Sequence, residues 1–321
     1  MIALEVIQDR DGLQEFQPEW SKFVRKISPA TPFQTPEWLS AWWSHFGSGA
    51  LRLMVFRQAG EVAGVLPCFL HEWNGRRQIT LVGAGISDYL DPLFEPACVD
   101  NIVECIRGEL RSRADWDICD WQDLSRDTPL GILGTVVEDT ACSAIAIEQP
   151  FEAFLAARPS DLRRNLRRYN KKAEAIGCVR FKVAESADTE LMDALVSLHG
   201  ARWEKAGEAG MIEVNRSEAF LRDIAEQFGA RGWLRIFSLR FMDRIAAIIL
   251  AFCDETAIYG YLSAFDPQHE EFGFGRELLA QALRYAHERG YRRWNFLRGE
   301  EPYKFSWGAQ ALAKCRVIIR S

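Results

Sequence analysis

A glycine-bearing loop between a predicted strand and a predicted helix constrains the fold of this chain most strongly. The loop follows strand-like residues 256–264 and precedes residues 278–286, where apolar side chains recur at helical spacing. Glycines let a backbone approach an anion, and the free N–H groups of a helical first turn point toward it. The arrangement therefore predicts a phosphate site at Gly273, Phe274, Gly275 and Arg276.

The context of this loop carries the prediction, because a Gly-x-Gly pair alone is weak evidence. An isolated pair fits a glycine-bearing helix N-cap as well as a phosphate site. Here a further strand is expected at 292–297, directly after the helix. Strand, loop, helix and strand in this order favour the phosphate-binding interpretation.

Composition places the chain among soluble globular proteins. Its 321 residues suffice for two domains with separate cores, and the 48% hydrophobic and 26% charged fractions are ordinary for that class. No apolar run approaches the roughly 20 residues that cross a bilayer, and the N-terminus is expected to form a strand rather than a signal peptide. We expect a cytoplasmic location, with attachment to a membrane complex left open. The net charge of −6 argues weakly against a general nucleic-acid binder.

Cysteine, histidine and tryptophan usage points to structural roles. The eight cysteines form no Cys-x-x-Cys pair, and the five histidines show no metal-ligand spacing. We therefore expect reduced, mostly buried thiols and no metal. Most of the eleven tryptophans are expected in the core, with a few left as candidates for an acceptor groove.

The order of predicted elements indicates an α+β fold built from two similar halves. In each half, helices precede a β-hairpin, a third strand, a helix and a further strand. The hairpins at 51–70 and 233–253 correspond, which we interpret as a tandem duplication with domains at 1–150 and 151–321. The first half has no glycine loop after its third strand. Only the second half is therefore expected to keep the phosphate site, with the first forming a wall for the other substrate.

The second half resembles the GNAT acyl-CoA transferase superfamily. In that superfamily a loop of the form Gln/Arg-x-x-Gly-x-Gly/Ala holds the pyrophosphate of coenzyme A, and here Glu270–Gly275 reads Glu-Glu-Phe-Gly-Phe-Gly. Glu270 stands at the position of the basic or amide residue, and Arg276 is placed to compensate. The resemblance implies two tandem GNAT-like domains and acetyl-CoA or another acyl-CoA as co-substrate. It also implies direct attack in a ternary complex, without a Ser or Cys nucleophile.

Over nearly its whole length the chain more specifically resembles the CelD-like acetyltransferases associated with cellulose and exopolysaccharide biosynthesis. Four stretches carry this resemblance: residues 33–38, 162–174, 265–267 and 296–304. The branch implies a saccharide or cell-envelope precursor as acceptor. The tandem arrangement also resembles the Fem family, which implies aminoacyl transfer from tRNA as an alternative. A non-catalytic component of a polysaccharide machine is a third interpretation, favoured by Glu270 and by Asn295, which replaces the usual Asp.

An acidic loop in the first half supplies candidates for acceptor chemistry. We expect Asp88 to act as a general base, with Tyr89 and Asp91 binding the acceptor in a groove between the halves. An Asx-turn, with Asp91 ahead of Pro92, explains the same residues equally well.

A turn near the C-terminus supplies the remaining catalytic candidates. Tyr303 would protonate the leaving thiolate, because its reference pKa near 10 is close to that of a thiol. Lys304 would neutralise a phosphate or the oxyanion. The alternatives are an aromatic core residue and a solvated lysine. Arg298 is a candidate for substrate binding, or for a structural ion pair with Glu300.

Six cations fall within the ten residues from Arg163 to Lys172 and form two adjoining helical rows. A solvated face is one explanation. The functional alternatives are a phosphate-bearing acceptor, the anionic membrane surface beside polysaccharide machinery, and a tRNA acceptor stem. Arg202 and Trp203, on the next predicted helix, are candidates for substrate binding, whereas His199 more often represents a core histidine.

Overall fold

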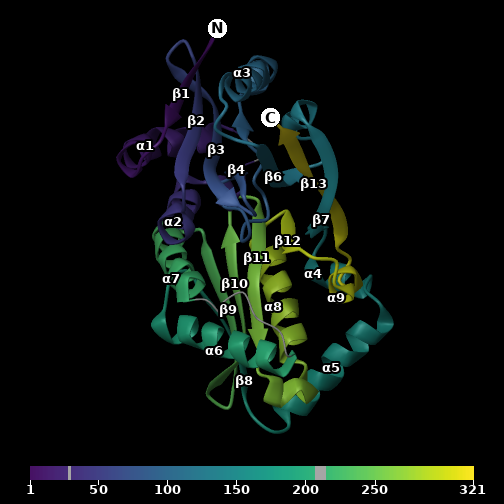
Figure 1. Ribbon diagram of the computed structural model, residues 1–321. Helices are drawn as coiled ribbons and strands as arrows, with labels where there is room; N and C mark the ends of the chain where they lie inside the picture. The colour runs from purple at the N-terminus through teal and green to yellow at the C-terminus, as the bar shows by residue number, and fades with distance from the viewer. Residues whose placement is uncertain (28–29, 207–214) are drawn as a thin grey trace. The chain divides into compact units, whose positions relative to one another are not determined.

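The computed structural model describes residues 1–27, 30–206 and 215–321, with the side chains of 202–206 and 215 excluded. The chain divides into two compact units, whose elements are labelled in Figure 1. The first unit comprises Met1–Ala141 and Ala313–Ser321, and the second comprises Cys142–Leu312. This division differs from the expected 150/151 boundary in two respects. It falls inside a strand, and the C-terminal residues group with the first unit.

The first unit is an antiparallel meander extended by one parallel strand. Its strand order is β1-β2-β3-β4-β6-β13, with β5 beside β3 and β4 parallel to β6. The strands are β1 (Ile2–Ile7), β2 (Ala50–Gln58), β3 (Glu61–Trp73), β4 (Arg76–Leu81), β5 (Leu93–Phe94), β6 (Ile118–Ser125) and β13 (Gln310–Arg320). The helices are α1 (Arg10–Lys26), α2 (Pro36–Phe46) and α3 (Val99–Ser112), with short 3-10 turns η1 (Pro32–Gln34), η2 (Pro96–Cys98) and η3 (Pro129–Leu133).

Helix α2 begins as its sequence predicts. The Thr35 side chain accepts a hydrogen bond from the Trp38 N–H, and Pro36 occupies the first helical turn, where a missing N–H costs nothing. The helix then buries Trp38, Trp42 and Trp43. This burial confirms that these tryptophans belong to the core.

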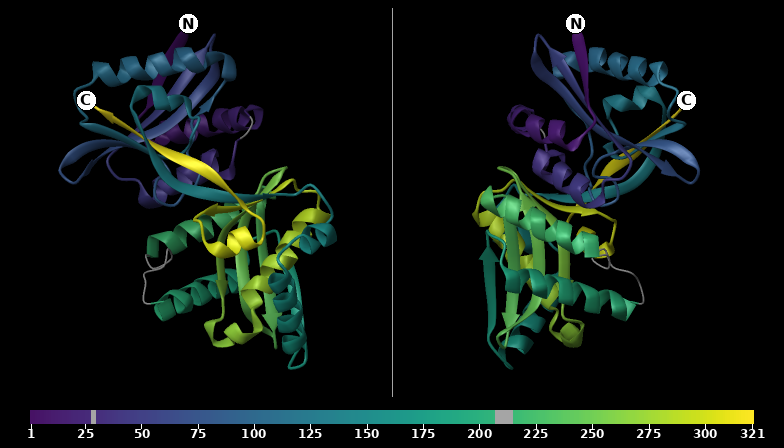
Figure 2. Two further views of the ribbon diagram at one scale, coloured as in Figure 1. Left: turned by 90° about the vertical axis from the view of Figure 1, so that its right-hand side faces the viewer. Right: turned by 60° about the vertical axis from the view of Figure 1, so that its left-hand side comes forward.

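The second unit has the strand order β7-β12-β11-β10-β9-β8. Its strands are β7 (Thr135–Ala146), β8 (Val179–Ala184), β9 (Leu234–Phe241), β10 (Arg244–Cys253), β11 (Ala257–Phe265) and β12 (Arg293–Arg298). Its helices are α4 (Phe151–Ala156), α5 (Ser160–Glu174), α6 (Thr189–Ala206), α7 (Asn215–Ala230), α8 (Phe274–Glu288) and α9 (Pro302–Ser306), with η4 (Pro267–Phe272) ahead of α8. In Figure 2, α6 and α7 cover one face of this sheet, and α5 and α8 cover the other.

The two units repeat one arrangement, which confirms the predicted α+β fold of two similar halves. In each, a parallel strand pair is joined over three residue pairs, by β4 with β6 and by β11 with β12. In each, the second strand of the pair contains a residue in the left-handed conformation, Asp123 (φ 60°) or Leu297 (φ 62°). The register with the antiparallel neighbour, β13 beside β6 and β7 beside β12, shifts next to both residues, as expected for β-bulges.

Burial explains how α8 is held in the second unit. Its apolar face buries Leu278, Ala282, Leu283 and Ala286 against a sheet whose central strand β10 is buried at almost every position. A strand covered on both faces reads as a continuous apolar run. Within the described part of the chain, no helix combines the length and the apolar character of a membrane span.

Candidate functional site

The parallel strands β11 and β12 of the second unit separate before β11 ends. Pairing between β11 and β12 ends at Tyr259 opposite Asn295. Strand β11 continues along β10 as far as Phe265, and η4 then carries the chain to the first turn of α8. The helix therefore begins at the carboxyl end of β11, which is where ligands of open α/β sheets bind.

The first turn of α8 presents backbone N–H groups that the helix itself does not use. Gly273 adopts the left-handed conformation (φ 61°) and precedes the helix. The N–H groups of Arg276 and Glu277 both donate to the Gly273 carbonyl, at 3.0 and 3.1 Å. The N–H groups of Phe274 and Gly275 lie ahead of these bonds, at the positive end of the helix dipole. This geometry suits a phosphate oxygen.

Both glycines also have packing reasons for their small size. A Cβ on Gly273 would lie 2.7 Å from the ring of Tyr169, and one on Gly275 would lie 3.0 Å from the ring of Phe265. Phe274 between them is 3% exposed and packs its ring against Phe241. Its side chain therefore belongs to the core, and its backbone N–H is the part that a ligand can use.

Helix α5 brings cations to this turn, which the sequence did not reveal. The guanidinium groups of Arg168 and Arg276 lie 4.8 and 5.7 Å from the centre of the Tyr169 ring. The Lys172 ammonium lies 4.8 Å from the centre of the Phe272 ring. Cations held on aromatic faces in this way stay near the start of α8.

Two glutamates accompany these cations. Glu270 and Glu271 are exposed in η4, and the Glu270 carbonyl accepts from the Gly273 N–H. Asp266 is occupied by the loop itself, since its carboxylate accepts from the Gln268 N–H and contacts the His269 ring at 2.8 Å. The turn therefore carries both signs of charge, with the cations supplied mainly from outside η4.

Lys304 lies buried in α9, the short helix that follows the loop after β12. It is 2% exposed, and its ammonium donates to the carbonyls of Arg298 (2.6 Å) and Gly299 (3.1 Å) and pairs with Glu301 (2.9 Å). Three donors thus meet three acceptors. These contacts hold the loop, and the catalytic role expected for Lys304 stays a prediction.

The other candidates of this loop are accessible. Tyr303 is 46% exposed, with its ring edge-on to Phe296. The Arg298 side chain is exposed as well. Asn295 is buried, and its side-chain oxygen accepts from the Leu297 N–H at 2.8 Å, which supports the left-handed residue. Tyr303 and Arg298 are thus exposed to solvent, and the roles expected for them stay predictions.

In the first unit, the loop carrying Asp88, Tyr89 and Asp91 binds to β6. The Leu90 N–H donates to the Asp123 carbonyl, and the Asp91 carboxylate accepts from both the N–H and the hydroxyl of Ser125. Asp91 is therefore bonded across to a neighbouring strand rather than only within its own turn. In the first unit this loop therefore lies beside the parallel strands β4 and β6. In the second unit the corresponding strands are β11 and β12.

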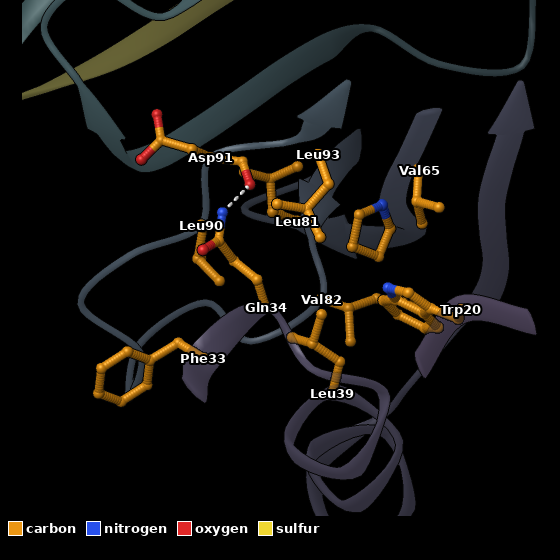
Figure 3. Close-up of a pocket in the computed structure, with 11 residues that line it drawn as sticks. Trp20, Phe33, Gln34, Leu39, Val65, Leu81, Val82, Leu90, Asp91 and Leu93 are labelled. Atoms are coloured by element: carbon orange, nitrogen blue, oxygen red, sulfur yellow. Dashed lines mark hydrogen bonds between the residues drawn. The ribbon is translucent and has the colours of Figure 1, made fainter. Parts of the chain in front are cut away.

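The surroundings of this loop are packed. Figure 3 shows the Gln34 side chain donating to the Asp91 carbonyl at 2.6 Å. The adjacent cavity measures about 10 Å³, room for roughly one water molecule. Asp88 is 8% exposed, and the Tyr89 ring lies between Phe33 and the buried ammonium of Lys314. These contacts anchor the loop, and the predicted acceptor roles of its residues remain untested.

Three further candidates, His199, Arg202 and Trp203, belong to α6. His199 is 3% exposed, which agrees with a core histidine. The side chains of Arg202 and Trp203 lie outside the described residues. Among the residues described, no group of three or more His, Cys, Asp or Glu side chains is arranged to hold a metal ion.

Comparison with protein families gives a match within the second unit. Residues 160–305 match the family model described as an acetyltransferase (GNAT) domain. This segment spans α5 to α9 and contains the whole region around the α8 N-terminus. No curated protein matches the chain.

Solved structures match the fold over the whole chain at low sequence identity. FemX superposes with a TM-score of 0.65 at 12% identity, covering 98% of this chain and 97% of its own. L-PGS from Bacillus licheniformis gives 0.62 at 12% identity, with 95% and 91% covered. A tandem GNAT protein from the clavulanic acid biosynthesis pathway gives 0.55 at 12% identity, with 99% and 98% covered. The chain therefore has the tandem GNAT fold.

Proposed function

We propose that this protein is an acyl-CoA-dependent acyltransferase whose donor site lies at the N-terminus of α8. The observation that carries the proposal is the first turn of α8. There the N–H groups of Phe274 and Gly275 precede the first hydrogen bonds of the helix. The turn follows the carboxyl end of β11, which has separated from its parallel neighbour β12. The match of residues 160–305 to a GNAT acetyltransferase domain supports this assignment.

The residues at this turn fit a pyrophosphate. Two backbone N–H groups and the helix dipole favour an anion, and Arg168, Lys172 and Arg276 supply positive charge beside the turn. Glu270 opposes the anion, but it is exposed and therefore well screened by solvent. We infer that the cations on α5 perform the task that a basic residue at position 270 would perform.

The acceptor is proposed to be a saccharide or a cell-envelope precursor. The support is the resemblance of residues 265–267 and 296–304 to CelD-like acetyltransferases. Tyr303, exposed beside β12, is proposed to return a proton to the leaving thiolate as the acceptor attacks the thioester carbon. Asp88 is proposed to take the proton of the acceptor.

Calorimetric titration with acetyl-CoA tests the donor site. We expect binding with a dissociation constant on the order of micromolar. Arg276→Glu should weaken it about tenfold or more, because a cation beside the pyrophosphate becomes an anion. Arg164→Glu makes the same charge change at an exposed position of α5 and should leave binding within about twofold. Absence of binding to the wild type, or equal losses in both variants, would remove the proposal.

A second candidate is aminoacyl transfer from tRNA, in the manner implied by the Fem resemblance. The observation in its favour is the exposed basic surface of α5, where Arg164 and Lys171 form no ion pair with a described carboxylate. This candidate requires tRNA binding that falls steeply between two salt concentrations, together with no response to acetyl-CoA. The same exposed cations would also serve association with a membrane-bound polysaccharide machine.

A further inference from the structure

The second unit contains a cavity that adjoins the proposed donor turn but is lined by other residues. Its volume is about 190 Å³, below the roughly 300–1,000 Å³ of sites for drug-sized ligands, so its occupant is small. Helices α4, α5 and α8 form its walls. It is lined by Phe151, Leu155, Arg163, Leu166, Arg167, Asn170, Glu277, Ala280, Gln281 and Arg284.

Three arginines give this cavity its charge. Arg163 and Arg167 lie one turn apart on α5, and Arg284 comes from α8. Arg163 donates through Nε to the Arg158 carbonyl, and Arg284 pairs with the exposed Glu152. Arg167 forms no ion pair with a carboxylate among the described residues. Like charges one turn apart repel each other, and a bound anion relieves that repulsion.

The carboxylate in the lining is already satisfied. Glu277 is 7% exposed and accepts from the side chains of Asn170 and Gln281, both at 2.7 Å. Burial raises the pKa of Glu277, although the hydrogen bonds and Arg284 act in the opposite direction. The lining therefore has three cations against one hydrogen-bonded acid.

The remaining wall is apolar. Phe151 and Leu166 are buried, Leu155 is half-buried, and Ala280 supplies the small surface that leaves the space open. The Arg284 guanidinium lies 4.3 Å from the centre of the Phe151 ring, so the charged and apolar walls meet. A ligand that fits both walls carries an anionic group on a compact apolar body.

We propose that this cavity binds a small organic anion, a carboxylate or a phosphate monoester with an apolar or aromatic body. Arg167 and Arg163 hold the anionic group, and Phe151, Leu155 and Leu166 cover the body. None of Gly273, Phe274, Gly275 or Arg276 lines the cavity, so the site is distinct from the proposed donor turn.

Titration of the full chain with phenyl phosphate, benzoate and neutral benzyl alcohol tests this proposal. The measurement is calorimetry, supported by the shift in thermal unfolding. We expect phenyl phosphate or benzoate to bind with a dissociation constant of about 0.1–1 mM, as suits a ligand of this size. The stronger of the two identifies the preferred anionic group. Benzyl alcohol should bind at least about tenfold more weakly, because it offers the arginines no charge.

Variants locate the binding. Arg167→Ala removes an arginine of the lining and should weaken the anion about tenfold. Lys171→Ala removes an exposed cation one turn further along α5 and should change nothing beyond about twofold. Ala280→Leu fills the cavity without changing charge and should abolish binding, with circular dichroism confirming the fold. Gly275→Glu blocks the α8 N-terminus and should leave binding intact.

Three results would overturn the proposal. The first is an absence of binding by both anions at concentrations of about 10 mM, ten times the expected weakest constant. The second is equal binding of benzyl alcohol. The third is binding that survives Arg167→Ala and disappears in Gly275→Glu, which would place the anion at the helix N-terminus.

Discussion

At the scale of single residues, Lys304 shows how a buried charge holds a loop. Its ammonium bonds two carbonyls and one carboxylate, and the loop that it supports contains Gly299 in the left-handed region (φ 105°). Removing this ammonium would leave buried carbonyls without donors, so we expect the stability of the loop to depend on it.

Replacing Lys304 by methionine tests this role. Lys304→Met keeps the length of the side chain, removes all three donors, and should lower the free energy of unfolding by about 2–4 kcal/mol. Glu301→Gln alters only the half-exposed partner and should cost about 0–1 kcal/mol. Urea unfolding followed by circular dichroism measures both. Equal unfolding midpoints for Lys304→Met and the wild type would show that the loop does not depend on this ammonium.

At the scale of elements, Glu277 links α8 to α5 through Asn170 and makes their packing sensitive to pH. Burial is the main cause that raises the pKa of Glu277 above its ordinary value of 4.5. The folded chain therefore binds this proton more tightly than the unfolded chain does. In the window above pH 4.5, up to the raised pKa, stability must fall as pH rises.

A comparison with Glu277→Gln isolates this contribution. The wild type should lose stability relative to the variant as pH rises from 4.5, because other carboxylates contribute equally to both proteins and cancel in the difference. Urea midpoints measured at several pH values between about 4 and 7 give the curve. A difference that does not change with pH would contradict the assignment.

The helices and strands were largely predictable, because their periodicity reports burial directly. The pattern predicted hairpins at 51–70 and 233–253, and the structure pairs β2 with β3 and β9 with β10 over these ranges. Strands β7 and β8 were missed. In β7 the first half is exposed, so no apolar run marks it. In β8 the alternation of apolar and polar residues was an available signal, carried by only six residues at the edge of the sheet.

The site was predictable only in part. The glycines of the α8 loop could be picked out from the sequence. Gly273 has a positive φ, and aromatic rings approach both Gly273 and Gly275 closely. The contributions of Tyr169 and Glu277 do not follow, because they depend on α5 packing against α8 more than 100 residues away in the sequence. The available signal in the sequence was a tyrosine, Tyr169, inside the basic run. Its role beside Gly273 becomes visible only from the tertiary contacts.

At the scale of the whole molecule, the division of the chain shows that the first unit is completed by the C-terminus. Residues 314–320 of β13 pair with β6, and Lys314 within them is buried against Asp91 and Tyr89. A fragment of residues 1–141 would leave β6 without this partner and would expose an apolar edge.

Fragments test this completion. Residues 1–141 alone should aggregate or remain partly unfolded, whereas the same fragment joined by a flexible linker to residues 313–321 should give a cooperative unfolding transition. A matched control joins a scrambled version of the final segment. Cooperative folding of residues 1–141 alone would contradict the role given to β13.

The proposed function requires an acyl-CoA donor to bind at the first turn of α8. Hydrogen exchange with and without acetyl-CoA, read by mass spectrometry over the whole chain, tests it most directly. We expect slower exchange in peptides covering residues 270–278, where the N–H groups of Phe274 and Gly275 gain acceptors. Protection confined to other segments, with residues 270–278 unchanged under saturating acetyl-CoA, would contradict it.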